Sequence, residues 1–277
     1  MKWMITADSS CDLRTLVTGS GEIGYETVPF VLTLDDVDYK DTPELDIPSF
    51  VAHMEKSRSS HSSCPSPGDW AEVFEKADNT IAFTISANLS GSHNSAVSAS
   101  HMVMEEHPDK KISVVDSLST GPKLVVMVSK ALEMIQKGEP LEKVTEACEQ
   151  IAHSMRTIFT LCSFHNLAQN GRIGKLASFV VQHLGIRVIG AGSKEGRIQM
   201  KDKARGDGKT LKRVLELMEE EGYTGTSVFV SHCLNEGLAI QFKNMIQQKW
   251  AQAKVEIFAT RGLDSYYAEN RGLIVAY

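Results

Sequence analysis

The stretch WMITADSS, residues Trp3–Ser10, decides the fold class. Its first part, Trp3–Ala7, is a short apolar run typical of a buried strand, and Asp8–Ser10 ends that run in a polar turn. The same pattern of an apolar run and a polar, Ser-rich turn recurs at Ile81–Ile85 and Ile112–Val115. Segments of helical periodicity separate these runs along the chain. Short strands that alternate with helices predict an α/β protein built on a mainly parallel sheet.

The polar turns after these three strands are the first candidate site. They are Asp8–Ser10, Ser86–Ser92 and Asp116–Ser119. Ligands of open α/β sheets bind beside the carboxyl ends of the strands. We therefore expect the three turns to converge on one site, although they lie far apart in the sequence.

The rest of the chain continues the alternation of helices and strands, and a boundary near residue 154 predicts two domains, 1–154 and 155–277. Helices are expected at Pro48–Lys56, Gly68–Ala77, Ser92–Glu106, Gly121–Lys137, Leu141–Ser154, Ile173–His183, Asp207–Glu221 and Asn235–Trp250. Further strands are expected at Thr157–Ser163, Arg187–Ala191, Gly196–Lys201, Ser227–Ser231, Val255–Ala259 and Gly272–Tyr277.

Composition excludes several classes of protein. The 277 residues contain no apolar run long enough to cross a bilayer, and the first residues do not resemble a secretory signal, so we expect a cytoplasmic protein without integral membrane association. The net charge of −6 is the wrong sign for a protein that wraps nucleic acid. Five scattered cysteines without a CxxC pair support neither a disulfide framework nor a zinc site.

The stretch Ser59–Gly68 is too polar for a core strand and contains too many prolines for a helix. We expect an ordered loop or a linker. Its hydroxyl groups are able to donate to an anion, whereas the alternative is a solvated connector. Cys64, in the same stretch, is a nucleophile only if its surroundings favour the thiolate.

Residues Ser86–Ala96 follow an apolar strand and begin a helix, so their hydroxyls lie where free N–H groups and the helix dipole favour an anion. The alternative is that Ser90 or Ser92 simply caps the helix. Arg172, beside Gly171, either pairs with a ligand or partner anion or is an ordinary surface arginine.

No established enzyme motif is present. The glycines Gly190, Gly192 and Gly196 miss the spacing of a dinucleotide-binding loop and predict a hairpin instead. A nucleophile elbow, a Walker loop and an HExxH motif are all missing, and the nine histidines lack metal-ligand spacing.

Five segments together resemble, in order and spacing, the DegV family of bacterial lipid-binding proteins. They are Ile5–Leu13, Ser62–Ser66, Leu89–Ala96, Val115–Ser117 and Asn170–Ile173. The resemblance implies a two-domain DegV-like fold, with an N-terminal parallel-sheet α/β/α domain and a C-terminal α/β domain. A lipid tunnel then lies between or beside them.

The resemblance also implies the function: a single long-chain fatty acid is bound with its acyl chain in an apolar tunnel and its carboxylate between hydroxyl groups. Some family members are the non-catalytic, fatty-acid-binding subunit of bacterial fatty acid kinase and present the acid to a separate ATP-dependent subunit. The protein is then expected to be a binding protein and not an enzyme, with no cofactor besides the bound acid and no nucleic-acid partner.

Site residues follow from the matched motifs. Ser62 stands in the place of the family's carboxylate-binding Thr, with Ser63 beside it, and both keep a hydroxyl group. Ser90, Gly91 and Ser92 match the family's Leu-Ser-Gly-Thr turn, with Ser92 in the Thr place. The resemblance makes these five residues the carboxylate site.

The family's Gly-Arg-Ile turn matches Gly171–Ile173, which makes Arg172 a contact for the kinase subunit. The chain departs from the family at Tyr267–Gly272, where members carry a His-x-Gly-Pro-Gly segment. That His is implicated in the kinase-coupled reaction, so its loss puts kinase coupling in question.

Two other functions remain as alternatives. One is a stand-alone enzyme for acyl or phosphoryl transfer that uses the same cleft, with Asp8, Asp116 or His93 as the acid or base. The other is an interaction module that has lost its lipid.

Overall fold

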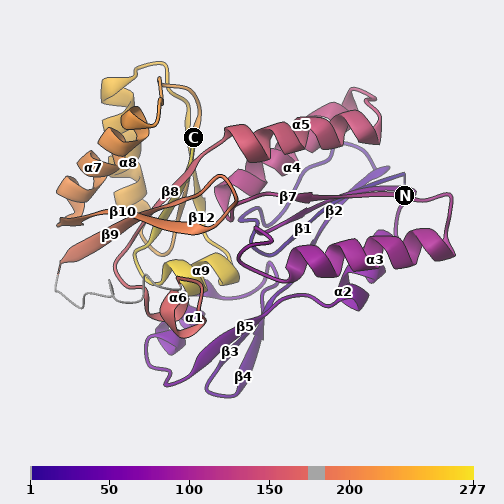
Figure 1. Ribbon diagram of the computed structural model, residues 1–277, viewed down its shortest axis with the longest axis horizontal. Helices are drawn as coiled ribbons and strands as arrows, with labels where there is room; N and C mark the ends of the chain where they lie inside the picture. Colours follow the sequence, from indigo (N-terminus) through magenta and orange to yellow (C-terminus); the bar gives the residue numbers. More distant parts are fainter. Residues whose placement is uncertain (1, 174–184) are drawn as a thin grey trace.

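The computed structural model describes residues 2–173 and 185–277, which form three β-sheets with helices packed against them (Figure 1). The strands are β1 (Trp3–Asp8), β2 (Ile23–Val28), β3 (Val31–Leu34), β4 (Val37–Lys40), β5 (Ser60–Ser63), β6 (Asn79–Thr84), β7 (Lys111–Asp116), β8 (Thr157–Leu161), β9 (Ile186–Gly192), β10 (Ile198–Arg205), β11 (Val228–His232), β12 (Val255–Ala259) and β13 (Leu273–Ala276). The helices are α1 (Ile47–Met54), α2 (Pro67–Phe74), α3 (Ser92–Glu106), α4 (Pro122–Gln136), α5 (Leu141–Ser154), α6 (His165–Gln169), α7 (Asp207–Glu220), α8 (Glu236–Lys249) and α9 (Gly262–Ala268).

The first sheet is parallel throughout, in the order β2-β1-β6-β7. Side chains of β1 alternate between its two faces, as the pleat requires. Met4 packs in one hydrophobic cluster with Trp70 of α2, whereas Ile5 packs in another with Leu124 of α4. Because helices cover both faces, β1 is buried on both sides and its sequence is a continuous apolar run. The predicted parallel-sheet α/β/α arrangement is confirmed (Figure 1).

The second sheet has six strands in the order β10-β9-β8-β13-β11-β12, and only its β11–β12 pair is parallel. Helices α7 and α8 pack against one face through a cluster that includes Leu211 and Phe242. Strands β9 and β10 form an antiparallel hairpin, as the glycine spacing predicts. This mixed sheet is the predicted C-terminal α/β part of the chain.

The third sheet is small and antiparallel, in the order β4-β3-β5, and it corrects one prediction. Ser60–Ser63, expected to be loop or linker, is the edge strand β5, with Leu34 paired to Ser60 and Val31 to Ser63. The backbone ladder with β3 supplies the hydrogen bonds that define the strand. A strand at a sheet edge needs no apolar side chains on its outer face, so polarity alone did not exclude it.

Other elements were not predicted, namely β2, β3, β4, α6 and α9. Conversely, the helix expected over Ile173–His183 lies outside the described residues, apart from Ile173 itself. None of the described helices has both the length and the apolar character that crossing a membrane requires.

A hydrophobic cluster joins the small sheet to the second half of the chain. Leu32 of β3 and Phe50 of α1 belong to the same buried cluster as Phe159 of β8 and Leu263 of α9. Helix α9 therefore lies where all three sheets meet (Figure 1). The limits 1–154 and 155–277 stay a proposal for the domain division.

Candidate functional site

One cavity is lined by residues from both halves of the chain. Its walls are mainly apolar, and they include Phe30, Ile85, Phe159, Leu161, Leu263 and Ile274. These side chains come from β8, β13, α9, the end of β6 and the loop before β3. A concave, largely apolar cavity with a few polar groups is the usual form of a small-molecule site.

Hydroxyl groups of β5 face α9. Ser60 and Ser62 lie on one face of the strand, two residues apart, and each is paired with a tyrosine of the helix. The Tyr266 hydroxyl donates to Ser60 Oγ at 2.8 Å, and the Ser62 and Tyr267 hydroxyls are 2.7 Å apart. Ser62 and Tyr267 line the cavity, whereas Ser63, on the opposite face of β5, is exposed and does not.

Burial raises the pKa of Tyr267, and the hydrogen bond with Ser62 and the positive charge of Arg172 partly offset that increase. The phenol is therefore neutral at physiological pH and both donates and accepts hydrogen bonds.

Ser90, in the turn that follows β6, also lines the cavity and is half-buried. Its Oγ accepts a hydrogen bond from the Ser92 backbone N–H at 3.2 Å. Gly91 is exposed, and neither it nor Ser92 belongs to the cavity lining. Ser92 is fully buried, and its hydroxyl donates to Asp8 Oδ2 at 2.6 Å, away from the cavity.

Asp8 connects the ends of three elements. Its carboxylate accepts hydrogen bonds from the Ser10 hydroxyl at 2.5 Å, the Ile85 N–H at 3.0 Å and the Ser92 hydroxyl. Burial raises the pKa of Asp8, and these hydrogen bonds oppose the rise. Asp116 similarly accepts from the backbone N–H groups of the turns that contain Ala87 and Leu118. The three Ser-rich turns therefore meet, but Asp8–Ser10 does not line the cavity, so only the other two contribute to the predicted common site.

Two arginines also line the cavity. Arg172 follows α6, is half-buried and donates to the Asn170 carbonyl oxygen. Arg197, from the β9–β10 connection, is exposed where it lines the cavity. Neither guanidinium group forms an ion pair with a carboxylate of residues 2–173 or 185–277. The site thus combines hydroxyl donors with positive charge.

A second group of polar residues lies in the wall of the same cavity. The hydroxyls of Ser119 and Thr157 are 2.7 Å apart, and both residues are buried. The Thr120 hydroxyl donates to Asp264 Oδ1 at 2.5 Å. All four residues line the cavity, and Asp264 is 2% exposed.

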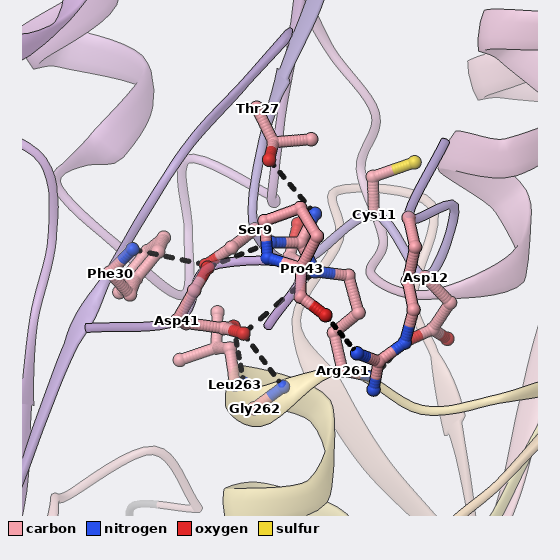
Figure 2. Close-up of polar contacts among 12 residues, drawn as sticks. Ser9, Cys11, Asp12, Thr27, Phe30, Asp41, Pro43, Arg261, Gly262 and Leu263 are labelled. Atoms are coloured by element: carbon pink, nitrogen blue, oxygen red, sulfur yellow. Dashed lines mark hydrogen bonds and ion pairs between the residues drawn. The ribbon is translucent and has the colours of Figure 1, made fainter. Parts of the chain in front are cut away.

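Behind α9 lies a buried charged cluster (Figure 2). Asp41 accepts hydrogen bonds from the N–H groups of Gly262 and Leu263, at 2.9 and 2.8 Å, and so holds the first turn of the helix. Arg261 donates to the Asp41 carbonyl oxygen at 2.7 Å and to Thr27 Oγ1 at 2.9 Å. Its Nε is 3.8 Å from Asp41 Oδ1, and both side chains are fully buried.

Two further carboxyl groups flank this cluster. Asp12 Oδ1 accepts from the Arg261 N–H at 2.8 Å, and Asp12 Oδ2 faces Asp264 Oδ2 across Gly121. A Cβ atom at Gly121 would lie 2.7 Å from Asp264 Oδ2 and 3.1 Å from Asp12 Oδ2. Burial raises the pKa of Asp12 to about 6, and burial together with the Asp12 charge raises the pKa of Asp264. Since two adjacent buried carboxylates repel, the pair retains one proton between them.

The groups considered for acid–base catalysis lie elsewhere. Asp8, His93 and Asp116 do not line the cavity, and His93 Nδ1 is 3.1 Å from the Thr84 hydroxyl. Cys64 is half-buried and also lies outside the lining. Within the described ranges, one group of side chains, Glu75, Glu106 and His107, is close enough together to hold a metal ion, but it is exposed and remote from the cavity lining.

Comparison with known proteins identifies the family. The family model for an uncharacterised protein of the DegV family matches residues 2–268. The chain belongs to the DegV family. A DegV domain-containing protein of Streptococcus pyogenes serotype M1 is 36% identical over 278 residues, which cover 100% of this chain and 99% of that protein.

Two solved DegV-type structures are especially similar. The Fatty Acid Kinase B3 protein of Streptococcus pneumoniae, loaded with linoleic acid, superposes with a TM-score of 0.95 at 37% identity and covers 100% of this chain and 99% of its own. A DegV family protein of Eubacterium eligens, loaded with heptadecanoic acid, gives a TM-score of 0.92 at 35% identity, with coverage of 99% and 98%. The two-domain DegV fold predicted from the sequence is confirmed.

The predicted site residues fall into two groups in this DegV protein. Ser62, Ser90 and Arg172 line one cavity, although they are far apart in the sequence, whereas Ser63, Gly91 and Ser92 do not line it. Sequence reasoning missed Asp264 and the role of Tyr267. Tyr267 and Ser62 are 205 residues apart in the sequence, and no local sequence pattern indicates such a contact.

Proposed function

We propose that this DegV protein binds one long-chain fatty acid, with the acyl chain in the apolar cavity and the carboxylate at Ser62 and Ser90. The observation that carries the proposal is a cavity that combines an apolar wall with these two hydroxyls. The fatty acids in the pneumococcal and Eubacterium relatives support the same ligand class.

The expected binding free energies give the acyl tail and the carboxylate head group different roles. Each buried methylene contributes about 0.8 kcal/mol, so the acyl chain supplies most of the affinity. A hydrogen bond to a charged acceptor contributes about 1.5 to 3 kcal/mol, so two hydroxyls orient the carboxylate. Tyr267 fixes the direction of the Ser62 hydroxyl through their 2.7 Å contact.

The protein acts, in this proposal, as a binding protein in the cytoplasm and presents its fatty acid to a separate ATP-dependent kinase subunit. Its resemblance to a fatty acid kinase B3 protein supports this role. Binding is favoured over catalysis because Asp8, His93 and Asp116 lie outside the cavity lining and are held by other contacts. Arg172 is proposed as the contact for the kinase subunit, next to the head-group site.

The test of fatty-acid binding is native mass spectrometry of the purified protein, followed by titration with octadecanoic acid. A bound mass that resolves into a fatty acid on denaturation is the expected result. The double variant Ser62→Ala, Ser90→Ala should bind at least tenfold more weakly, since two charged hydrogen bonds are lost. Ser63→Ala is the matched control, because Ser63 is on the same strand but faces away. Equal affinity of the double variant and the wild type would refute the head-group assignment.

The kinase role is tested separately by acyl phosphate formation with an added fatty acid kinase catalytic subunit. Arg172→Ala should reduce the rate of phosphorylation while octadecanoic acid still binds. Loss of fatty-acid binding in the same variant would instead make Arg172 a ligand residue.

A further inference from the structure

We propose that the acyl cavity contains a second polar subsite, formed by Ser119, Thr120, Thr157 and Asp264, that accepts a hydroxyl group carried on the acyl chain. The inference rests on the proposed function, because it concerns which fatty acids this cavity prefers. The ligand class is a hydroxylated long-chain fatty acid.

The first observation is that four polar residues share one wall of an otherwise apolar cavity. Ser119 and Thr157 are 5% and 9% exposed, and their hydroxyls bond to each other at 2.7 Å. Each hydroxyl has one proton and two acceptor lone pairs, so this pair keeps unused acceptor capacity. An unsubstituted acyl chain packed against this wall uses none of it.

The second, independent observation is the carboxyl group of Asp264. The residue lines the cavity and is 2% exposed. Its Oδ2 lies beside Asp12 Oδ2 behind the helix, whereas its Oδ1 accepts a hydrogen bond from Thr120 of the same wall. A carboxyl oxygen accepts more than one hydrogen bond, so Oδ1 keeps capacity for a second donor.

A ligand hydroxyl matches both observations. It donates its proton to Asp264 Oδ1 or to a free lone pair of Ser119 or Thr157, which uses acceptor capacity that an unsubstituted chain leaves unused. An unsubstituted acyl chain cannot form these hydrogen bonds. It is therefore bound more weakly than a hydroxylated acid whose hydroxyl group reaches the wall.

The position of the subsite along the chain follows from α9. Asp264 precedes Tyr267 by three residues, which places their Cβ atoms about 5 to 6 Å apart on one face of the helix. Because Tyr267 contacts Ser62 at the head-group end, the second subsite is about one helical turn away from it. A hydroxyl at one particular distance from the carboxylate should therefore bind best.

The experiment measures displacement of a fluorescent fatty acid by octadecanoic acid and by hydroxyoctadecanoic acids. Their hydroxyl groups lie near the carboxylate, in mid-chain or near the terminal methyl group. One hydroxy isomer should bind about three- to tenfold more tightly than octadecanoic acid, the range that one net hydrogen bond supplies.

The double variant Ser119→Ala, Thr157→Val removes both partners of one hydrogen bond and keeps the shape of the wall, so the fold should survive. It should lose the preference for the hydroxy isomer and still bind octadecanoic acid. The matched control is Ser113→Ala, Thr145→Val, a Ser–Thr pair at 2.8 Å between β7 and α5 that does not line the cavity. This control should keep the preference.

Equal affinity for octadecanoic acid and every hydroxy isomer would overturn the subsite while leaving the proposed function intact. An unchanged preference in the Ser119→Ala, Thr157→Val variant would also overturn it. Failure of all the acids to bind would overturn the proposed function and the subsite together.

Discussion

Replacing Asp264 with asparagine is expected to stabilise the protein at neutral pH and to flatten the pH dependence of its unfolding free energy. In the wild type, Asp264 Oδ2 faces Asp12 Oδ2, and both carboxyl groups are buried. In the Asp264→Asn variant, the new side-chain amide instead donates a hydrogen bond to Asp12, and its oxygen still accepts from Thr120. The substitution thus imitates the protonated form of the pair without taking up a proton.

The magnitude follows from the shifted pKa. Burial and the charge of Asp12 raise the pKa of Asp264 well above its ordinary value of 3.8, so the folded pair holds a proton that the unfolded chain releases at lower pH. The stability that this proton provides is fully present below the unfolded pKa and is lost as the pH rises through the folded one. While the pair keeps this proton, the loss above the unfolded pKa is about 1.4 kcal/mol per pH unit, which amounts to about 3 kcal/mol by pH 6. The Asp264→Asn variant avoids most of that loss.

The assay is urea unfolding of the wild type and the variant, followed by fluorescence at a series of pH values. The two unfolding free energies should agree near pH 4, and the variant should be more stable at pH 6 and above, by about 3 kcal/mol or more. Asp41→Asn is the contrasting control. Since it leaves the buried Arg261 without that carboxylate, it should destabilise the protein by about 3 to 5 kcal/mol at neutral pH. An Asp264→Asn variant that is less stable than the wild type at pH 7, or a difference that does not vary with pH, would refute the shared proton.

Three other substitutions test the packing of the fold by the same unfolding assay, and a fourth, Tyr267→Phe, is tested by displacement. Gly121→Ala should cost about 3 kcal/mol or more, because φ is +66° and the new methyl group would meet Asp264 Oδ2 at 2.7 Å; a loss below about 1 kcal/mol would contradict that geometry. Tyr266→Phe should cost about 1 to 3 kcal/mol, since Ser60 and Asn170 each lose a buried partner at 2.8 Å, whereas Tyr267→Phe should mainly weaken fatty-acid binding in the displacement assay. Trp70→Ala should cost about 3 to 5 kcal/mol because the indole is fully buried between the sheet and α3; an unchanged urea midpoint would show that this cluster is not a rigid core.

The parts of the fold that could be predicted are those whose sequence pattern reflects burial. Trp3–Ala7 is apolar because helices cover both faces of β1, and the hairpin at Gly192–Gly196 carries its own turn glycines. Strand Ile23–Val28 was missed because it is a half-buried edge strand that includes Gly24 and Glu26. Ser60–Ser63 was misassigned because its pairing with β3 depends on backbone groups that composition does not report.

The residues of the candidate site were likewise only partly predictable from the sequence. The resemblance in the motifs led to Ser62, Ser90 and Arg172, and all three line the cavity. It also named Ser92, but the Ser92 hydroxyl donates to the buried carboxylate of Asp8 instead. That contact depends on where the fold places the end of β1, which the sequence motif does not show. Asp264 and Tyr267 gain their roles from residues more than 100 positions away, so no local pattern marks them.

The contact between Arg261 and Asp41 has a consequence for synthesis on the ribosome. The two residues are 220 positions apart. Asp41 therefore leaves the ribosome long before Arg261, its buried counter-ion, is synthesised. At about 5 to 20 residues per second, the delay is about 10 to 45 s. During that interval the nascent chain has no counterpart for the Asp41 carboxylate and no α9 against which the small sheet can pack. The parallel sheet can form while translation continues, but the wall of the cavity is completed only after Ile274 has left the ribosome.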